Sequence, residues 1–235
     1  MTKGSISSIE TLGLLDGPGI RVVVFLNGCL LRCKYCHNPE MWKIKDYNYT
    51  KEELVKKILR YKPYFNDQGG VTFSGGEPLL QSEFLLEVIK DLKKEHIHVA
   101  LDTSGVSNKL SEEILKLVDL VIFDVKHIDD SGYKELTGLD IEESLKFIEL
   151  CNKLEKKLWI RQVIIPEVND NKEYIKGLHE FLKKIKGIEK VEFLPYHKLA
   201  INKYEKLGIT DPYKDKEAMS KEKCNKLYEK FLKAE

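Results

Sequence analysis

The chain has 235 residues, of which 42% are hydrophobic and 33% charged, yet its formal net charge is only +1. This length suits one domain, 1–235, with enough apolar residues for a sizeable core. With positive and negative charges nearly equal, the sequence shows neither the basic surface expected for nucleic-acid binding nor the polybasic segment expected for binding to a membrane surface. No apolar run approaches the roughly 20 residues that span a bilayer, and the first residues lack a signal-peptide pattern. We therefore expect a cytoplasmic protein that binds neither nucleic acid nor membrane.

Strand-like and helix-like segments alternate along the chain. The first helix begins near Thr50, where Thr50 and Glu53 have the spacing of a capping box. The alternation indicates right-handed parallel βαβ units, and six units are too few for a full eight-stranded barrel. We predict an α/β fold, a partial (β/α)6 barrel of parallel strands. The predicted strands are 21–26, 71–73, 98–101, 120–125, 158–165 and 190–194, and the later helices are 83–95, 111–118 (capped by Ser111), 141–154, 174–185 and about 220–232.

Chemically unusual residues gather where these strands end. In folds of this kind the carboxyl ends of the strands carry the chemistry, so we expect one site at this rim. Its candidates, in chain order, are Cys29, Cys33 and Cys36 after the first strand, Gly75, Gly76 and Glu77 after the second, Asp102 and Thr103 after the third, Asp124 and Lys126 at the end of the fourth, Arg161 within the fifth, and His197 after the sixth.

Three of the five cysteines form a C-x-x-x-C-x-x-C loop, Cys29, Cys33 and Cys36. Thiolates are soft ligands that suit iron–sulfur clusters, zinc and copper(I), and a reducing compartment disfavours a disulfide. A cubane cluster normally takes four cysteines, so three would leave one iron open to another ligand. Cys151 and Cys224 stand alone in helical patterns, which is typical of buried packing.

Zinc is the competing interpretation of this loop. His37 directly follows Cys36 and could complete a Cys3His site. Structural zinc motifs usually place two ligand pairs well apart, so that the metal joins distant segments. A zinc ion bound by four ligands of one short loop would not connect distant segments of the chain. The spacing therefore favours an iron–sulfur cluster over structural zinc. A zinc-stabilised adaptor without catalysis is kept as the alternative from another functional class.

The cysteine loop, 28–39, reads GCLLRCKYCHNP, and the second strand ends in SGGEP at 74–78. Together these motifs resemble the radical S-adenosylmethionine (radical SAM) superfamily. The further segments DGPGIR, LDTSG, VIFDVK, WIRQVIIP and FLPYHKL, taken in this order, are similar to its glycyl-radical enzyme activases. Activases with extra clusters often carry a cysteine-rich insert, but no cysteine lies between Cys36 and Cys151. This favours the branch that acts on pyruvate formate-lyase.

The resemblance implies one [4Fe–4S] cluster that reductively cleaves S-adenosylmethionine. The adenosyl radical would take a hydrogen from a backbone glycine in the glycine loop of pyruvate formate-lyase. Flavodoxin or ferredoxin would supply the electron, and a monomer is expected. An activase of another glycyl-radical enzyme and a small-molecule radical SAM enzyme are the alternatives within this chemistry.

The resemblance also implies roles for individual residues. Gly75 and Gly76 would hold the cofactor's ammonium group, with Glu77 either a partner for that group or a turn acid. The remaining cofactor contacts would come from Tyr35 and His37 beside adenine and from Asp124, Val125, Lys126, Arg161 and His197. Asp124 with Lys126 could also be a simple ion pair, and Arg161 could equally be paired with an acid within the fold. Asp102, Thr103 and Asp124 match a monovalent-cation site, and Asp16, Gly17 and Arg21 would present backbone to the partner or form only a turn.

Overall fold

The computed structural model describes residues 2–107 and 109–233. Its centre is a seven-stranded sheet in the order β2-β3-β5-β6-β7-β8-β9. Six of these strands are parallel, and β2 pairs with β3 in the antiparallel direction. Their bounds are β2 Ile6–Gly13, β3 Arg21–Leu26, β5 Gly70–Gly75, β6 His98–Thr103, β7 Leu120–Val125, β8 Leu158–Ile164 and β9 Ile188–Pro195.

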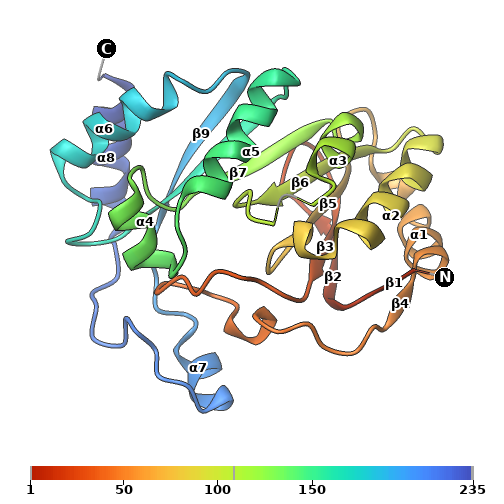
Figure 1. Cartoon of the computed structure of the whole chain (residues 1–235), viewed down its shortest axis with the longest axis horizontal. Coiled ribbons are helices and arrows are strands. Elements are labelled where there is room, and N and C mark those ends of the chain that lie inside the picture. The colour runs from red at the N-terminus through yellow and green to blue at the C-terminus, as the bar shows by residue number, and fades with distance from the viewer. Residues whose placement is uncertain (1, 108, 234–235) are drawn as a thin grey trace.

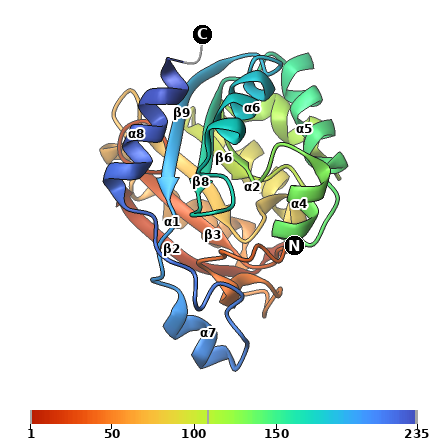
Figure 2. The same cartoon turned by 90° about the vertical axis from the view of Figure 1, so that its left-hand side faces the viewer.

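Helices cover the outer face of the curved sheet (Figures 1 and 2), and α7 projects away from it below the strand ends. The helices are α1 Lys51–Leu59, α2 Ser82–Lys94, α3 Ser111–Leu117, α4 Asp130–Thr137, α5 Glu142–Lys153, α6 Lys172–Leu182, α7 Ile201–Leu207 and α8 Lys221–Leu232, with 3-10 turns η1 Pro39–Met41, η2 Lys62–Tyr64 and η3 Pro78–Gln81. A small second sheet joins β1 Lys3–Gly4 to β4 Tyr49–Thr50. No helix among the described residues is long and apolar enough to cross a bilayer.

The predicted α/β barrel of six parallel strands is confirmed, with one addition. The antiparallel strand β2 was missed because its sequence, ISSIETLG, is largely polar and most of its residues are exposed. An edge strand needs no continuous apolar run, unlike the strands buried on both faces. The linear strand order leaves β2 and β9 as the two edges, so the barrel is open.

The helix starts were predicted with mixed success. The capping box of α1 is confirmed, because Thr50 Oγ1 accepts from Glu53 N at 3.2 Å and Thr50 N donates to Glu53 Oε2 at 2.8 Å. The predicted cap of α3 is wrong, since Leu110 occupies that position with φ +57° and Ser111 is already helical. Helices α4 and α7 were not predicted at all. Both are short. Helix α4 has an N-cap, Asp129, whose carboxylate accepts from Gly132 N at 2.9 Å, and this signal was overlooked, whereas α7 begins after Ala200 without a side-chain cap.

Candidate active site

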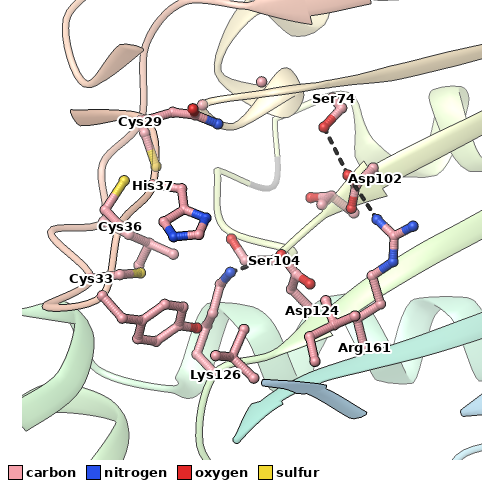
Figure 3. A pocket seen from close by; sticks show the side chains of 18 of the residues that line it. Cys29, Cys33, Cys36, His37, Ser74, Asp102, Ser104, Asp124, Lys126 and Arg161 are labelled. Atoms are coloured by element: carbon pink, nitrogen blue, oxygen red, sulfur yellow. Dashed lines mark hydrogen bonds and ion pairs between the residues drawn. The ribbon is translucent and has the colours of Figure 1, made fainter. Parts of the chain in front are cut away.

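The carboxyl ends of the parallel strands surround a cavity of about 400 Å³ (Figure 3). The cysteine loop, residues 28–39, forms one wall, and the ends of β5 to β9 form the others. Residues from 16 to 197 therefore meet in one place, as the rim argument predicted. The predicted residues that line it are Asp16, Cys29, Cys33, Tyr35, Cys36, His37, Gly75, Gly76, Asp102, Thr103, Asp124, Lys126, Arg161 and His197.

The cysteine loop is held from two sides by helices that the sequence analysis missed. Arg32 N donates to the carbonyl oxygen of Thr137, at the end of α4, at 2.7 Å. On the other side, Tyr204 in α7 donates its hydroxyl to the carbonyl oxygen of Cys36 at 3.1 Å. These bonds fix the backbone of a loop that has no regular structure of its own. The thiols are therefore positioned before any ligand binds.

The three thiols lie on the same side of the cavity (Figure 3). Burial, the largest cause, raises the pKa of the Cys29 thiol to about 12 and that of Cys33 to about 11. Both are therefore protonated at neutral pH unless a cation takes the place of the proton. Three soft donors on one short loop, with the other two cysteines buried in α5 and α8, suit a cluster that keeps one iron open.

Two glycines bring the backbone of β5 against the cysteine loop. Gly75 has φ +121°, and a Cβ there would lie 2.3 Å from Leu26 N. A Cβ on Gly76 would lie 2.2 Å from the carbonyl oxygen of Gly28. No side chain fits at either position without moving backbone. Both glycines line the cavity beside the thiols, so main-chain atoms rather than side chains form this part of its wall.

The wall opposite the thiols carries an arginine surrounded by acids. Arg161 places Nη1 3.4 Å from Asp16 Oδ1 and 3.5 Å from Asp102 Oδ2, and its Nε lies 3.4 Å from Glu192 Oε2. Ser74 donates its hydroxyl to Asp102 Oδ2 at 2.7 Å. Burial and then the charge of Asp124 raise the pKa of Asp102 to about 7, against the opposing effect of Arg161. The ionisation of Asp102 therefore changes near neutral pH.

Between the two walls lies the pair formed by Asp124 and Lys126. Lys126 Nζ is 2.8 Å from Asp124 Oδ2 and 5.7 Å from the ring centroid of Tyr35. Burial, the largest single effect, lowers the pKa of Lys126, but the charge of Asp124, the interactions with Tyr35 and Cys33 and the hydrogen bond to Asp124 together outweigh it and hold that pKa well above its usual value. The lysine therefore stays charged in a buried cavity, where it can attract a carboxylate.

Two histidines close the cavity on the side of α7. The rings of His37 and His197 are 3.6 Å apart, and His37 Nε2 lies 3.1 Å from the carbonyl oxygen of His197. His197 Nδ1 is buried and has no hydrogen-bond partner among the described residues. Buried polar atoms in folded proteins usually form a hydrogen bond, so an unpaired one indicates a place for a ligand or water. His197 is thus free to bind a ligand.

Two of the predicted cofactor contacts, Glu77 and Val125, have side chains that do not line the cavity, and for Glu77 this favours the alternative of a turn acid. Glu77 is only 1% exposed and does not line the cavity. Its two carboxylate oxygens instead accept hydrogen bonds from Thr103 Oγ1 at 2.5 Å and Ser104 Oγ at 2.7 Å, so it braces the ends of β5 and β6. Val125 turns its side chain into the hydrophobic core, because neighbouring residues of a strand face opposite sides.

Two of the three predicted partner contacts have their side-chain positions engaged within the fold. Arg21 is fully buried, and it donates from Nε to Thr72 Oγ1 and from Nη2 to the carbonyl oxygen of Val71, both at 2.7 Å. Gly17 packs closely against that arginine, since a Cβ on Gly17 would lie 2.9 Å from Arg21 Cδ. Of the three predicted residues only Asp16 lines the cavity. Gly17 and Arg21 act within the fold.

Sequence reasoning missed several residues that line the cavity. Ser74 opens the quoted SGGEP motif but was given no role, and Ser104 follows Thr103 in LDTSG. Trp42 lies beyond the quoted loop, after the turn η1, so no spacing rule pointed to it. The others are Phe25, Leu31, Asn38, Val163, Leu194, Pro195 and Tyr196. Most of these are apolar, and only their place in the fold distinguishes them from core residues.

Comparisons with known proteins agree with this geometry. The family model "Radical SAM superfamily" matches residues 23–182. The chain is 53% identical to the pyruvate formate-lyase-activating enzyme of Clostridium pasteurianum, over 99% of this chain and 98% of that protein, and 44% identical to that of Staphylococcus epidermidis, over 91% and 88%. The crystal structure of a domain of the pyruvate-formate lyase-activating enzyme from Bacteroides vulgatus has a TM-score of 0.57 at 27% identity, covering 71% of this chain and 94% of that one. A radical SAM methyltransferase from Sphaerobacter thermophilus shares the fold, with a TM-score of 0.67 at 17% identity over 98% of this chain and 75% of its own.

Proposed function

Because this chain belongs to the radical SAM superfamily and, within it, to the pyruvate formate-lyase-activating enzymes, we propose that it generates a glycyl radical on pyruvate formate-lyase. The observation that carries the proposal is the cavity itself, in which Cys29, Cys33 and Cys36 face groups suited to an amino acid and a nucleoside. Membership of this family leaves no support for the zinc-stabilised adaptor.

Cys29, Cys33 and Cys36 would hold the [4Fe–4S] cluster, whose chemistry when bound is one-electron cleavage of S-adenosylmethionine to methionine and a hydrogen-abstracting 5′-deoxyadenosyl radical. The chain supplies three thiolates, and no fourth cysteine lines the cavity among the residues that the structure describes, so the methionine amino and carboxylate groups can complete the site. Release of each thiol proton is required, because burial keeps the free thiols protonated.

The polar groups of the cavity would orient S-adenosylmethionine. Lys126 keeps its positive charge and would attract the methionine carboxylate. The carbonyl oxygens at Gly75 and Gly76 would accept from the methionine ammonium group, since the Gly76 N–H already donates to the Leu26 carbonyl oxygen at 2.8 Å. Asp124 offers an acceptor for ribose hydroxyls, and His197 offers an unpaired Nδ1. Each group is already held by its neighbours, so little ordering is needed when the ligand binds.

The glycine loop of pyruvate formate-lyase would enter beside Asp16. This residue lines the cavity, and the preceding carbonyl oxygen, that of Leu15, accepts from Arg161 Nη2 at 2.7 Å. Leu14 and Leu15 themselves are 70% and 81% exposed, which leaves an apolar edge at the entrance. Such an apolar edge would favour the binding of the partner's glycine loop, because the loop must lose its bound water before it can enter the cavity.

The electron donor, the oligomeric state with its location, and a bound cation are also proposed for this protein. Flavodoxin or ferredoxin is the proposed electron donor, because cluster potentials extend to about −700 mV and require a low-potential partner. A monomer in the cytoplasm is the proposed state. A monovalent cation at Asp102, Thr103 and Asp124 is also proposed, supported by two carboxylates on neighbouring strands, although the Thr103 hydroxyl is engaged by Glu77.

The test is anaerobic reconstitution with iron and sulfide, followed by mixing with S-adenosylmethionine, reductant and purified pyruvate formate-lyase. We expect a glycyl-radical signal by electron paramagnetic resonance (EPR) and formation of 5′-deoxyadenosine. Cys33→Ala should lose the cluster and both products, while the matched control Cys151→Ala, whose thiol is buried in α5, should keep them. Iron-free protein would overturn the proposal. A radical formed only on another glycyl-radical enzyme would change the partner, and 5′-deoxyadenosine without any protein radical would favour a small-molecule substrate.

A further inference from the structure

One cysteine of the loop receives a hydrogen bond from a side chain. Trp42 Nε1 donates to Cys36 Sγ at 3.3 Å, and both residues line the cavity. We propose that Trp42 is a positioning residue that raises the reduction potential of the cluster through this hydrogen bond. The inference rests on the proposed function, since it needs the cluster at Cys36.

The indole is held in this direction by its surroundings. Its own carbonyl oxygen accepts from Cys29 N at 3.1 Å, which ties the residue to the start of the cysteine loop. The Arg32 guanidinium lies 5.0 Å from the indole centroid, and the ring of Tyr204 meets it edge-on at 6.0 Å and 80°. With a cation on one side and an aromatic edge on another, the indole has few other orientations. Its N–H is therefore preorganised toward the sulfur.

The electrostatic consequence follows from the charge on sulfur. Iron ligation makes Cys36 a thiolate, which is a stronger acceptor than the thiol. Reduction adds one electron to the cluster, and part of that charge reaches the sulfur ligands. A donor aimed at sulfur thus stabilises the reduced state more than the oxidised state, which raises the potential. Cys36 is only partly exposed and lies in the cavity lining, where water screens this interaction poorly.

A second hydrogen bond to the same residue provides a matched comparison. The Tyr204 hydroxyl donates to the Cys36 carbonyl oxygen at 3.1 Å, so it holds the backbone without touching the sulfur. If the effect of Trp42 were merely structural, removing the Tyr204 hydroxyl would have a similar effect. If it is electrostatic at the sulfur, only the loss of the indole N–H should shift the potential.

The experiment is a redox titration of reconstituted Trp42→Phe, followed through the EPR signal of the reduced cluster. Phenylalanine keeps an aromatic ring between Arg32 and Tyr204 but has no N–H to donate. We expect the midpoint potential to become more negative than in the parent protein. Tyr204→Phe should leave it unchanged, as should Trp159→Phe, which alters the other tryptophan of the chain, on β8. An unchanged potential in Trp42→Phe, or an equal shift in Tyr204→Phe, would overturn the inference.

A second measurement covers the case in which Trp42→Phe loads no cluster. In the Trp159→Phe variant, tryptophan labelled with ¹⁵N at the indole reports on Trp42 alone. We expect pulsed EPR of the reduced cluster to show coupling to that nitrogen. No coupling would contradict the hydrogen bond, whatever the fate of Trp42→Phe. Failure of the parent protein itself to bind iron would count against the proposed function, and this outcome is distinct from an intact cluster with an unshifted potential.

Discussion

Glu77 and Thr103 are joined by a hydrogen bond of 2.5 Å between Thr103 Oγ1 and Glu77 Oε1, beneath the floor of the cavity. The second carboxylate oxygen accepts from the backbone N–H and the hydroxyl of Ser104 at 3.0 and 2.7 Å. Glu77 is therefore a brace between the turn after β5 and the end of β6. The glycine turn and Asp102, which neighbour these residues in sequence, owe their relative positions to this carboxylate.

Glu77→Gln should destabilise the protein. An amide keeps only one oxygen, and its NH₂ would face hydroxyl and N–H donors in a buried site. Leaving such groups unsatisfied costs about 1–3 kcal/mol. Thermal unfolding of the reconstituted protein without oxygen measures the loss. Glu83→Gln, an exposed acid paired with Lys109, is the control and should change little. An unfolding temperature equal to the parent's would contradict the role of Glu77.

Arg21→Met should reduce stability rather than partner recognition. The substitution strands the acceptors Thr72 Oγ1 and the Val71 carbonyl inside the fold, at a cost on the order of 3 kcal/mol. Denaturant unfolding measures this cost, with the exposed Arg60→Met as the control. The fraction of Arg21→Met that is folded should bind pyruvate formate-lyase with the same affinity as the parent protein. A stable variant that has lost partner binding would restore the role expected from the sequence.

Cation binding at the proposed site should strengthen as the pH rises through about 7, the raised pKa of Asp102. Below this value a proton competes for the carboxylate, so affinity at pH 6 should be about tenfold weaker than at pH 8. The measurement is the gain in unfolding temperature in potassium chloride over choline chloride. Asp102→Asn should remove the pH dependence, and Asp46→Asn, on the surface, should keep it. Equal gains at both pH values would refute the prediction.

Without an added cation, the raised pKa of Asp102 should make the free energy of unfolding depend on pH. Between pH 4 and 7 the folded protein holds the Asp102 proton, whereas the unfolded chain, with an ordinary value of 3.8, releases it. The contribution of this group to stability is therefore fully present below about pH 4 and is lost as the pH rises through 7. Parent protein and Asp102→Asn should differ in the slope of unfolding free energy across this range. Parallel curves would contradict the burial of an ionisable group there.

Lys203→Ala should loosen α7 from the cysteine loop. Lys203 Nζ binds Asn38 Oδ1 at 2.7 Å and Glu40 Oε1 at 2.6 Å. Such a partly exposed contact contributes up to about 1 kcal/mol, so amide hydrogen exchange in 201–207 should become up to about fivefold faster. Lys206→Ala, on the same helix, is the control. Unchanged exchange in Lys203→Ala would show that the Tyr204 hydroxyl and packing hold the helix without it.

Sequence by itself determined the barrel and the chemistry of its rim. Apolar strands buried on both faces and parallel crossovers leave little freedom in strand order, so residues as distant as Cys29 and Arg161 could be placed at one cavity. The spacing of the cysteines fixed the donor set for the same reason, because a short loop keeps its ligands together.

Only the tertiary structure decided which rim residues face the cavity. A side chain's direction at a strand end depends on the register and on neighbours remote in sequence. The Glu77 carboxylate therefore accepts hydrogen bonds from Thr103 and Ser104. The Arg21 guanidinium, at the amino end of β3, donates to Thr72, although both Glu77 and Arg21 belong to quoted motifs. Trp42 reached Cys36 Sγ because η1 turned the chain back and α7 packed against it. Contacts of this kind arise from packing between segments, and no local pattern encodes them.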